Sequence, residues 1–329
     1  MTKRKGIFDV NLNLNLDGGI LSEQQDLNQT KTFSEKRDFQ SAVNIIIKQM
    51  KVSGYRERTI SDYIRYSNHF QKITKIKYVE DISSQTIYDW LDSMDVSAQT
   101  KLTRLKCLKA ILGKFLNNQW IESKFWHDIN IKVSKKVKTG ANDKDVNVLL
   151  SLIDVNTFIG LRDAVAVLML YRTGVRINTL GQLEQKHIDF NNKILNLDGA
   201  ILKNHQLLKL PIDDEVIKLL KVLITQNNKI RNYYNEKNEF IFISAKGKSL
   251  LTKSTNNAIS KRLHFYSKKY GLDNINPHAL RRGFAKNLLN KGANLALISK
   301  ALGHSNLEVT TQYLDINVDE VVDNLRSFI

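Results

Sequence analysis

The spacing of apolar residues divides the chain into two predominantly helical stretches. Between residue 34 and about residue 130, apolar side chains recur every three or four positions, which is the period of an amphipathic helix. This pattern predicts four helices, over residues 38–51, from Thr59 to Phe70, from Ser84 through Trp90, and from Ser97 to Leu116. Thr59 with Asp62 is the predicted cap of the second helix. A small all-helical bundle is therefore expected here.

The second stretch mixes helices with a few strands. Its predicted helices are residues 146–153, residues 161–171, a helix opened by Arg176 after a break at Gly174, a basic helix over residues 253–270, and a last amphipathic helix through Val318, Val321, Leu325 and Phe328. Residues 193–197 and 207–211 are predicted to pair as an antiparallel ribbon, and residues 239–243 to form another short strand. We expect a mainly α-helical protein whose second domain is mixed α/β with a small antiparallel sheet.

Length and changes in composition indicate two domains. A chain of 329 residues can bury two separate cores. Residues 1–33 are polar and aperiodic, so we expect a flexible N-terminal arm, with a short strand at NLNLNL as the alternative. The predicted helical domain covers residues 34–131, the linker residues 132–143 (KVSKKVKTGAND), and the second domain residues 144–329. An ordinary surface loop would have the same composition as this linker.

The charge of the chain indicates a polyanionic partner. The formal net charge is +17 and the pI is near 9.7, which favours nucleic acid. The longest apolar runs, such as AVAVLML, are too short to span a bilayer, and the N-terminal sequence lacks the apolar segment and cleavage motif of a signal peptide. The single cysteine, Cys107, excludes an intramolecular disulfide. We expect a cytoplasmic protein.

The fourth predicted helix is unusually basic. No acidic residue lies between Asp95 and Glu122, and this interval contains Lys101, Arg104, Lys106, Lys109 and Lys114. Given the net charge, we predict that Lys101, Arg104, Lys106 and Lys109, with Lys135 and Lys136 of the linker, contact DNA phosphates. A solvated lysine-rich helix face is the alternative interpretation.

Residues 277–292 are predicted to form a helix with an arginine on its apolar side. Asn276 is a suitable N-cap, Pro277 suits the first helical position, and Gly292 ends the segment. The apolar face is formed by Leu280, Phe284, Ala285 and Leu288. Arg281 falls within this face and His278 at its edge, whereas Arg282 and Lys286 are predicted to point away. An inward arginine is unfavourable unless an anion meets it.

Two further helices follow. The first is predicted from Asn294 to Gly303, and Ser305 with Glu308 forms a capping-box pattern for the second. His304 is therefore expected in a tight corner between these helices, and Tyr313 on the helix that follows it.

The chain contains the segments HxLRR and LGH, followed by a tyrosine nine residues after the histidine of LGH. This arrangement resembles the catalytic box of the tyrosine recombinases, the phage-integrase family. The phrases SGYRERTISDYIRYSNHF and TKLTRLKCLKAILGKFL are similar to this family's core-binding domain. The resemblance implies an N-terminal helical, SAM-like core-binding domain followed by the catalytic domain. It also implies that the linker lets the two domains close around a DNA duplex.

The resemblance assigns six catalytic positions. Arg176 in GVRINTL matches the family's first arginine, found in the usual form GLRISEL, and Lys203 matches a lysine on the β-ribbon turn, with Lys209 and Lys193 as alternatives. His278 and Arg281 match the HxxR pair, His304 the second histidine, and Tyr313 the nucleophile. Both arginines would bind the scissile phosphate, His278 would accept the tyrosine proton, Lys203 would protonate the leaving 5′ oxygen, and His304 would donate a hydrogen bond to phosphate.

This chemistry implies a 3′-phosphotyrosyl intermediate and requires no metal, cofactor or ATP. The resemblance also implies a homotetramer that acts on two double-stranded DNA sites, with the last helix packed on a neighbouring protomer or folded back on its own domain. Integration or excision of a mobile element, resolution of dimers and inversion all remain open. A type IB topoisomerase and a DNA-binding protein of the same fold without catalytic activity are the alternatives.

The sequence departs from the family pattern at three places. Thr179 occupies a position that is commonly acidic, Arg282 one that is often histidine, and LKNHQ replaces a glycine-rich turn. None of these three departures removes a reacting group.

The segment Gly247-Lys248-Ser249 is not a P-loop, because Phe242 stands where the upstream glycine is needed.

Overall fold

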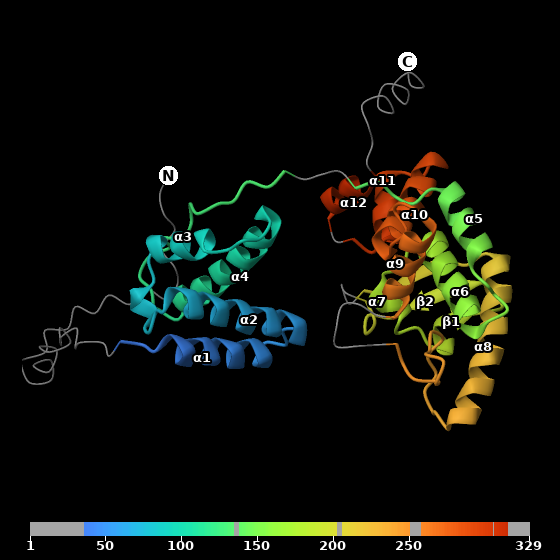
Figure 1. The fold of residues 1–329 in the computed structure, drawn as a ribbon, viewed down its shortest axis with the longest axis horizontal. Coiled ribbons are helices and arrows are strands. Elements are labelled where there is room, and N and C mark those ends of the chain that lie inside the picture. The colour runs from blue at the N-terminus through green and yellow to red at the C-terminus, as the bar shows by residue number, and fades with distance from the viewer. Residues whose placement is uncertain (1–35, 135–137, 203–205, 251–257, 305, 315–329) are drawn as a thin grey trace, which may run out of the picture. The chain divides into compact units, whose positions relative to one another are not determined.

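The computed structural model describes residues 36–134, 138–202, 206–250, 258–304 and 306–314 (Figure 1). The chain falls into two compact units, Met1–Lys135 and Lys136–Ile329, and each has a hydrophobic core of its own. The predicted N-terminal arm and the predicted helix after Tyr313 lie outside the described residues. Within the described ranges, no helix combines the length and the apolar character that a membrane crossing requires.

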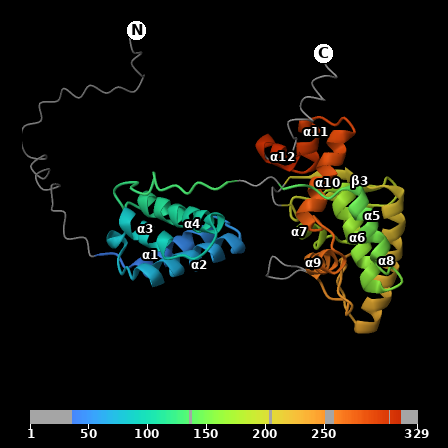
Figure 2. The same cartoon turned by 45° about the horizontal axis from the view of Figure 1, so that its top comes forward.

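The first unit is a bundle of helices (Figure 2). They are α1 (Phe39–Val52), α2 (Glu57–Thr74), the 3-10 helix η1 (Val79–Asp81), α3 (Ser84–Asp92) and α4 (Ala98–Asn117). The side chain of Ser97 caps α4 by accepting a hydrogen bond from the Thr100 N–H. The predicted Thr59–Asp62 cap is wrong, because α2 begins before it and the Asp62 carboxylate accepts from Arg58 Nε at 3.2 Å.

Aromatic side chains join the helices of the first unit. Phe39 of α1 lies 6.1 Å, between ring centroids, from both Phe70 of α2 and Phe115 of α4. Phe70 meets Trp90 of α3 edge-on at 5.3 Å. All four rings are fully buried. Edge-to-face contacts of this kind fix the relative orientation of the packed helices.

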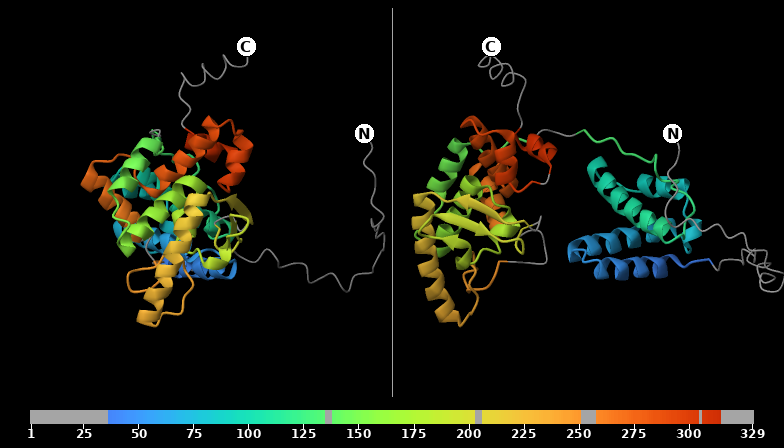
Figure 3. Two further views of the ribbon diagram at one scale, coloured as in Figure 1. Left: turned by 90° about the vertical axis from the view of Figure 1, so that its right-hand side faces the viewer. Right: turned by 180° about the vertical axis from the view of Figure 1, so that it is seen from behind.

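The second unit combines helices with a three-stranded sheet (Figure 3). Its elements are α5 (Asp143–Leu152), α6 (Phe158–Thr173), α7 (Ile177–Leu180), η2 (Gln185–His187), β1 (Ile188–Asp189), β2 (Ile194–Leu197), β3 (Leu208–Pro211), α8 (Asp214–Tyr234), α9 (Ala258–Tyr270), α10 (Pro277–Asn290), α11 (Leu295–Ala301) and α12 (Leu307–Leu314). The strands are antiparallel in the order β1-β2-β3, with Leu195 opposite Leu210. The predicted mainly α fold with a small antiparallel sheet is confirmed.

One predicted strand is wrong, and one long helix was absent from the predicted elements. Residues 239–243 form only isolated bridges, between Glu184 and Phe240 and between Ile243 and Ser249. Helix α8 has 21 residues and is capped by Asp213, whose side chain accepts from the Val216 N–H.

Helix α6 is the centre of the second unit. Its side chains from Gly160 to Tyr171 are buried on every side, and these include the paired Arg162 and Asp163. Helices α5, α8, α9 and α10 all pack against it. The C-terminal end of α6, at Gly174, thereby becomes a fixed point beside α10.

Helices α10, α11 and α12 form a compact corner with its own small core of Ala285, Ile298, Leu302 and Leu314. Asn276 caps α10, as predicted, and Asn294, where the next helix was predicted to begin, caps α11. Gly303 has a φ of 57°, a left-handed conformation that glycine adopts without strain, and it turns the chain from α11 towards α12. The predicted capping residue Ser305 lies outside the described residues.

The predicted orientations along α10 are only partly correct. Arg281 faces inward, with 3% of its surface exposed, as predicted. Arg282 was predicted to point away, but it is only 9% exposed. The cause is a contact that periodicity does not show: Arg282 Nε donates to the carbonyl of Thr139 at 3.0 Å.

Candidate active site

Arg281 links the ends of two helices. Its Nη1 donates to the carbonyl of Gly174, at the C-terminus of α6, and its Nη2 donates to the carbonyl of Leu302, at the C-terminus of α11. The carbonyls at a helix C-terminus carry partial negative charge, which favours a cation. These contacts fix the guanidinium beside the corner that leads into α12.

Arg176 reaches the same corner from another element. It is half-buried at the N-cap of α7, and its Nη2 donates to the carbonyl of Gly303 at 3.2 Å. The two guanidiniums therefore bind consecutive carbonyls, those of Leu302 and Gly303. Two like charges held this close together favour an anion between or beside them.

His304 completes this cluster and has a defined tautomer. Its Nε2 lies 3.1 Å from Arg281 Nη2, and its Nδ1 lies 2.9 Å from the hydroxyl of Thr310 on α12. A guanidinium can only donate, so Nε2 is the acceptor. The imidazole is then neutral with its proton on Nδ1, where it donates to the buried Thr310 hydroxyl.

Both candidate histidines, His304 and His278, resist protonation. Burial lowers the pKa of His304 to about 4, and the charges of Arg281 and Arg176 contribute to this. His278 is at the second position of α10, and part of its surface is exposed to solvent. Neighbouring protein atoms exclude water from the rest of the ring. This desolvation lowers its pKa, and the cations around it, Arg282 first, lower it further. Both rings are therefore neutral at pH 7.

The low pKa of His304 predicts a distinct acid response. We expect His304 in the DNA-free protein to titrate near pH 4, measured from the imidazole carbon shifts by NMR and assigned by loss of the signal in His304→Gln. Because an unfolded histidine has a pKa near 6.5, the unfolded chain binds the proton first as the pH falls. The stability that neutral His304 contributes is thus complete above pH 6.5 and is lost as the pH falls towards 4. A midpoint near 6.5 for His304 would contradict this arrangement.

The remaining catalytic candidates are placed only by the backbone or not at all. Tyr313 lies on α12, three residues after Thr310, but its side chain is outside the described part of the structure. Lys203 is also outside the described residues, on the β2–β3 connection. Thr179, which is buried, donates from its hydroxyl to the carbonyl of Ile201 at 3.3 Å. This position therefore ties α7 to the segment that leads to Lys203.

Comparison with known proteins places the chain in a family. The model of the phage integrase family matches residues 142–320, more than half of the chain. The chain belongs to the phage integrase family, the tyrosine recombinases. The match covers Arg176, His278, Arg281, His304 and Tyr313.

Curated relatives of this integrase-family chain match over most of their length. Tyrosine recombinase XerC of Bacillus pumilus is 24% identical over 285 residues, which cover 83% of this chain and 88% of the relative. Tyrosine recombinase XerD of Staphylococcus haemolyticus is 29% identical over 289 residues, 84% of this chain and 93% of the relative.

Solved structures share the fold. The Tn1549 transposon integrase in complex with a circular intermediate DNA has a TM-score of 0.69 at 18% identity, over 89% of this chain and all of that one. XerH bound to a palindromic difH substrate has a TM-score of 0.62 at 21% identity, over 87% of this chain and 83% of that one.

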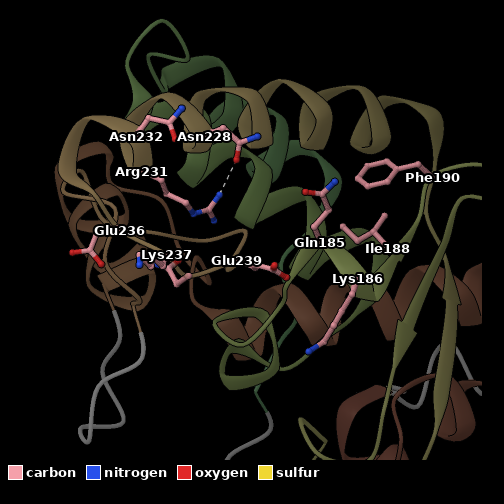
Figure 4. A pocket seen from close by; sticks show the side chains of 11 residues that line it. Gln185, Lys186, Ile188, Phe190, Asn228, Arg231, Asn232, Glu236, Lys237 and Glu239 are labelled. Carbon is pink, nitrogen blue, oxygen red and sulfur yellow. Dashed lines mark hydrogen bonds between the residues drawn. The ribbon is translucent and has the colours of Figure 1, made fainter.

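A groove and a larger hollow, both lined by described residues of the second unit, can be compared with this cluster. A groove of about 610 Å³ runs between β3 and α11, and Gly303 and His304 form part of its wall. A hollow of about 800 Å³ lies between η2–β1 and the C-terminal part of α8, with Lys186, Arg231 and Glu239 among its lining residues (Figure 4). The described catalytic candidates are not among the residues that line this larger hollow, so the arginine–histidine cluster identifies the candidate site better than cavity size does.

The basic residues of α4 do not share one face. Lys106 is exposed, whereas Lys101 and Arg104 are half-buried, and Arg104 Nη1 lies 3.3 Å from Met94 Sδ. Lys109 donates to the carbonyl of His127 at 3.1 Å, and burial lowers the pKa of its ammonium group. Lys109 thus tethers the segment after α4. Phosphate contacts by these residues stay a prediction, and Lys135 and Lys136 lie outside the described residues.

A cationic stripe on α2 was not predicted from the sequence. Arg58, Arg65 and Lys72 are all exposed and are spaced seven residues apart, which puts them on one side of the helix. The guanidiniums of Arg65 and Arg104 lie 5.5 and 5.9 Å from the ring centre of Tyr66, so this stripe continues onto α4. The heptad spacing of the three cations is the signal in the sequence that could have revealed it.

Proposed function

We propose that this protein is a site-specific recombinase that cuts and rejoins double-stranded DNA through a 3′-phosphotyrosyl intermediate. The observation that carries the proposal is the convergence of Arg176 and Arg281 on the corner at residues 302–304, directly before the helix of Tyr313. A scissile phosphate is an anion that two guanidiniums can bind with paired hydrogen bonds.

In the proposed reaction, the Tyr313 oxygen attacks the phosphorus and the bond to the 5′ oxygen breaks. Neutral His278 accepts the phenolic proton, which its lowered pKa leaves it free to do. Lys203 gives a proton to the departing 5′ oxygen. Rejoining reverses these steps when a 5′ hydroxyl attacks the phosphotyrosine. The energy of the broken bond is retained in the covalent link, so no ATP, metal or cofactor enters the balance.

His304 has a role of its own in this scheme. With Nε2 accepting from Arg281, the histidine orients that guanidinium rather than donating to an anion. Donation to phosphate requires a proton on Nε2 as well. An anionic phosphate nearby would raise the pKa of His304 and so favour the doubly protonated ring. Binding of DNA and protonation of His304 are therefore coupled in the proposal.

The partners follow from charge and from the relatives. The chain has a formal net charge of +17, and the structures of the Tn1549 integrase and XerH contain DNA. We extend the proposal to a homotetramer on two DNA sites, with the helix predicted after Tyr313 packed on the neighbouring protomer. The biological outcome would be integration or excision of a mobile element, or resolution or inversion of a DNA segment.

Covalent capture tests the proposal. The protein first selects its duplex from a randomised pool, and this duplex is then nicked at successive central positions. Next to a nick, the short strand released by cleavage diffuses away, so the strand cannot be rejoined. We expect a covalent protein–DNA adduct that survives denaturation, with the DNA mapped by mass spectrometry to the peptide containing Tyr313. Tyr313→Phe, which lacks only the hydroxyl, is the matched control and should give no adduct.

Plasmid relaxation and the capture assay together separate the alternatives. Relaxation of supercoiled plasmid that lacks the selected sequence would favour a type IB topoisomerase. Selection of a duplex without adduct from any nicked version would favour a DNA-binding protein without catalytic activity.

A further inference from the structure

The connector between the units is bound along α10. The backbone N–H of Ala141 donates to the carbonyl of Ala279 at 2.9 Å, and Arg282 Nε donates to the carbonyl of Thr139 at 3.0 Å. Both contacts lie within the second unit. We call residues 139–143, with the residues of α10 that they contact, the connector seam.

Two glycines allow the backbones in the seam to approach closely. A Cβ atom on Gly140 would lie 2.7 Å from the backbone N of Gly283 and 2.9 Å from the backbone C of Arg282. A Cβ atom on Gly283 would overlap the carbonyl oxygen of Ala141. Neither glycine has the positive φ that would itself call for glycine. Glycine is disfavoured in a helix interior, so Gly283 in α10 is explained by the space that the connector needs.

The far end of the seam is closed by a partly buried polar contact. The hydroxyl of Tyr171, on α6, donates to Asp143 Oδ1 at 2.7 Å and accepts from Asn287 Nδ2 at 3.0 Å. Burial, together with the Asp143 carboxylate, raises the pKa of Tyr171 to about 12, so the phenol keeps the proton that it donates. The seam thus spans α10 from Ala279 to Asn287.

The residues of the seam alternate with the catalytic candidates on α10. His278 and Arg281 flank Ala279, and Arg282 directly follows Arg281. A helix moves as a unit over one turn, so a displaced connector would shift both candidate groups together. Lys138, directly before the seam, is also one of the cations that lower the pKa of His278.

We propose that the connector seam positions His278 and Arg281, so that the rate of DNA cleavage depends on how the connector is seated on α10. Gly140, Arg282 and Gly283 are positioning residues in this scheme, since they act through the helix and not on the phosphate. The inference rests on the proposed recombinase function. It gives the linker a role in catalysis besides that of joining the two units.

Gly140→Ala gives the sharpest test, because it adds one methyl group and changes no charge. In the full chain we expect adduct formation at saturating nicked duplex to slow by roughly 10-fold or more, as displacements of about 1 Å remote from the chemistry do. The affinity of Gly140→Ala for the duplex, measured by gel shift, should stay within about twofold of the wild-type affinity. Thr139→Ala is the control, and its cleavage rate should stay within about twofold of the wild-type rate. That control alters the adjacent exposed side chain and keeps the carbonyl that Arg282 binds.

A second pair of variants keeps the test decisive if Gly140→Ala does not fold. Arg282→Met removes the donor to Thr139, and we expect it to slow cleavage at saturating DNA, with partial recovery in Arg282→Lys. Lys291→Met removes an exposed charge at the end of the same helix and should cleave at the wild-type rate.

Two outcomes would overturn the inference, and they are distinguishable. If wild type forms the adduct and the folded seam variants cleave equally fast, or lose affinity in proportion to rate, the seam has no positioning role. If wild type and every variant fail to form the adduct, the proposed function is wrong, and this inference falls with it.

Discussion

Arg281→Met is expected to slow DNA cleavage by about 10³-fold, the range seen when an oxyanion-stabilising donor or a phosphate-binding arginine is removed. Methionine has a similar reach and is apolar, so it fills the buried site without a charge. It cannot donate to Gly174, to Leu302 or to the histidine at position 304. The corner before α12 therefore loses its main link to α10 as well as a cation for the phosphate.

The rate should be measured as adduct formation in a single turnover at saturating nicked duplex. Arg281→Lys keeps the positive charge but cannot bridge several acceptors at once, so we expect an intermediate rate. Arg172→Met is the matched control, since Arg172 is 39% exposed and pairs with Asp213 and Glu215 instead. Wild-type cleavage by folded Arg281→Met would remove Arg281 from the mechanism.

The region around Arg281 was predictable because its signals are local. Asn276, Pro277 and Asn294 are capping residues that act within one turn, and the structure places α10 and α11 where they indicate. The inward direction of Arg281 follows from helical periodicity alone. The corner at His304 follows from the glycine before it, which has a positive φ.

Features that depend on distant contacts were not predictable. Arg282 is buried because it binds the carbonyl of Thr139, 143 positions away, and no pattern within α10 shows this. The apolar run at residues 239–243 has the composition of a strand, but the structure gives it only isolated bridges to Glu184 and Ser249. The composition of α4 predicts a basic helix, but it does not show which of the cations make contacts within the protein. Lys109 is one that does, because it donates to the carbonyl of His127.

The second large effect is expected on stability, from Asp163→Ala. Asp163 is 1% exposed, and its Oδ1 accepts from Arg162 Nε and Nη2 at 3.1 and 2.7 Å. Its Oδ2 accepts from Arg262 Nε at 2.8 Å and from the Tyr266 hydroxyl at 3.0 Å. This carboxylate joins α6 to α9. Alanine would leave Arg162, which is 3% exposed, without this carboxylate partner.

Removal of one partner from a buried ion pair destabilises a protein by about 3–5 kcal/mol. We expect this loss in the second unit, measured by urea unfolding followed by far-UV circular dichroism. All three tryptophans, Trp90, Trp120 and Trp126, lie in the first unit, so their fluorescence provides an internal control whose midpoint should not move. Asp163→Asn, which keeps one acceptor, should be affected less.

A double variant distinguishes an unpaired charge from lost packing. Arg162→Met with Asp163→Leu replaces the pair with apolar groups, and such replacements of buried ion pairs are often neutral or stabilising. We therefore expect the double variant to be more stable than Asp163→Ala alone, although Arg262 and Tyr266 also lose an acceptor. If Asp163→Ala changes the unfolding free energy by less than about 1 kcal/mol, the value typical of exposed pairs, the carboxylate does not hold α6 to α9.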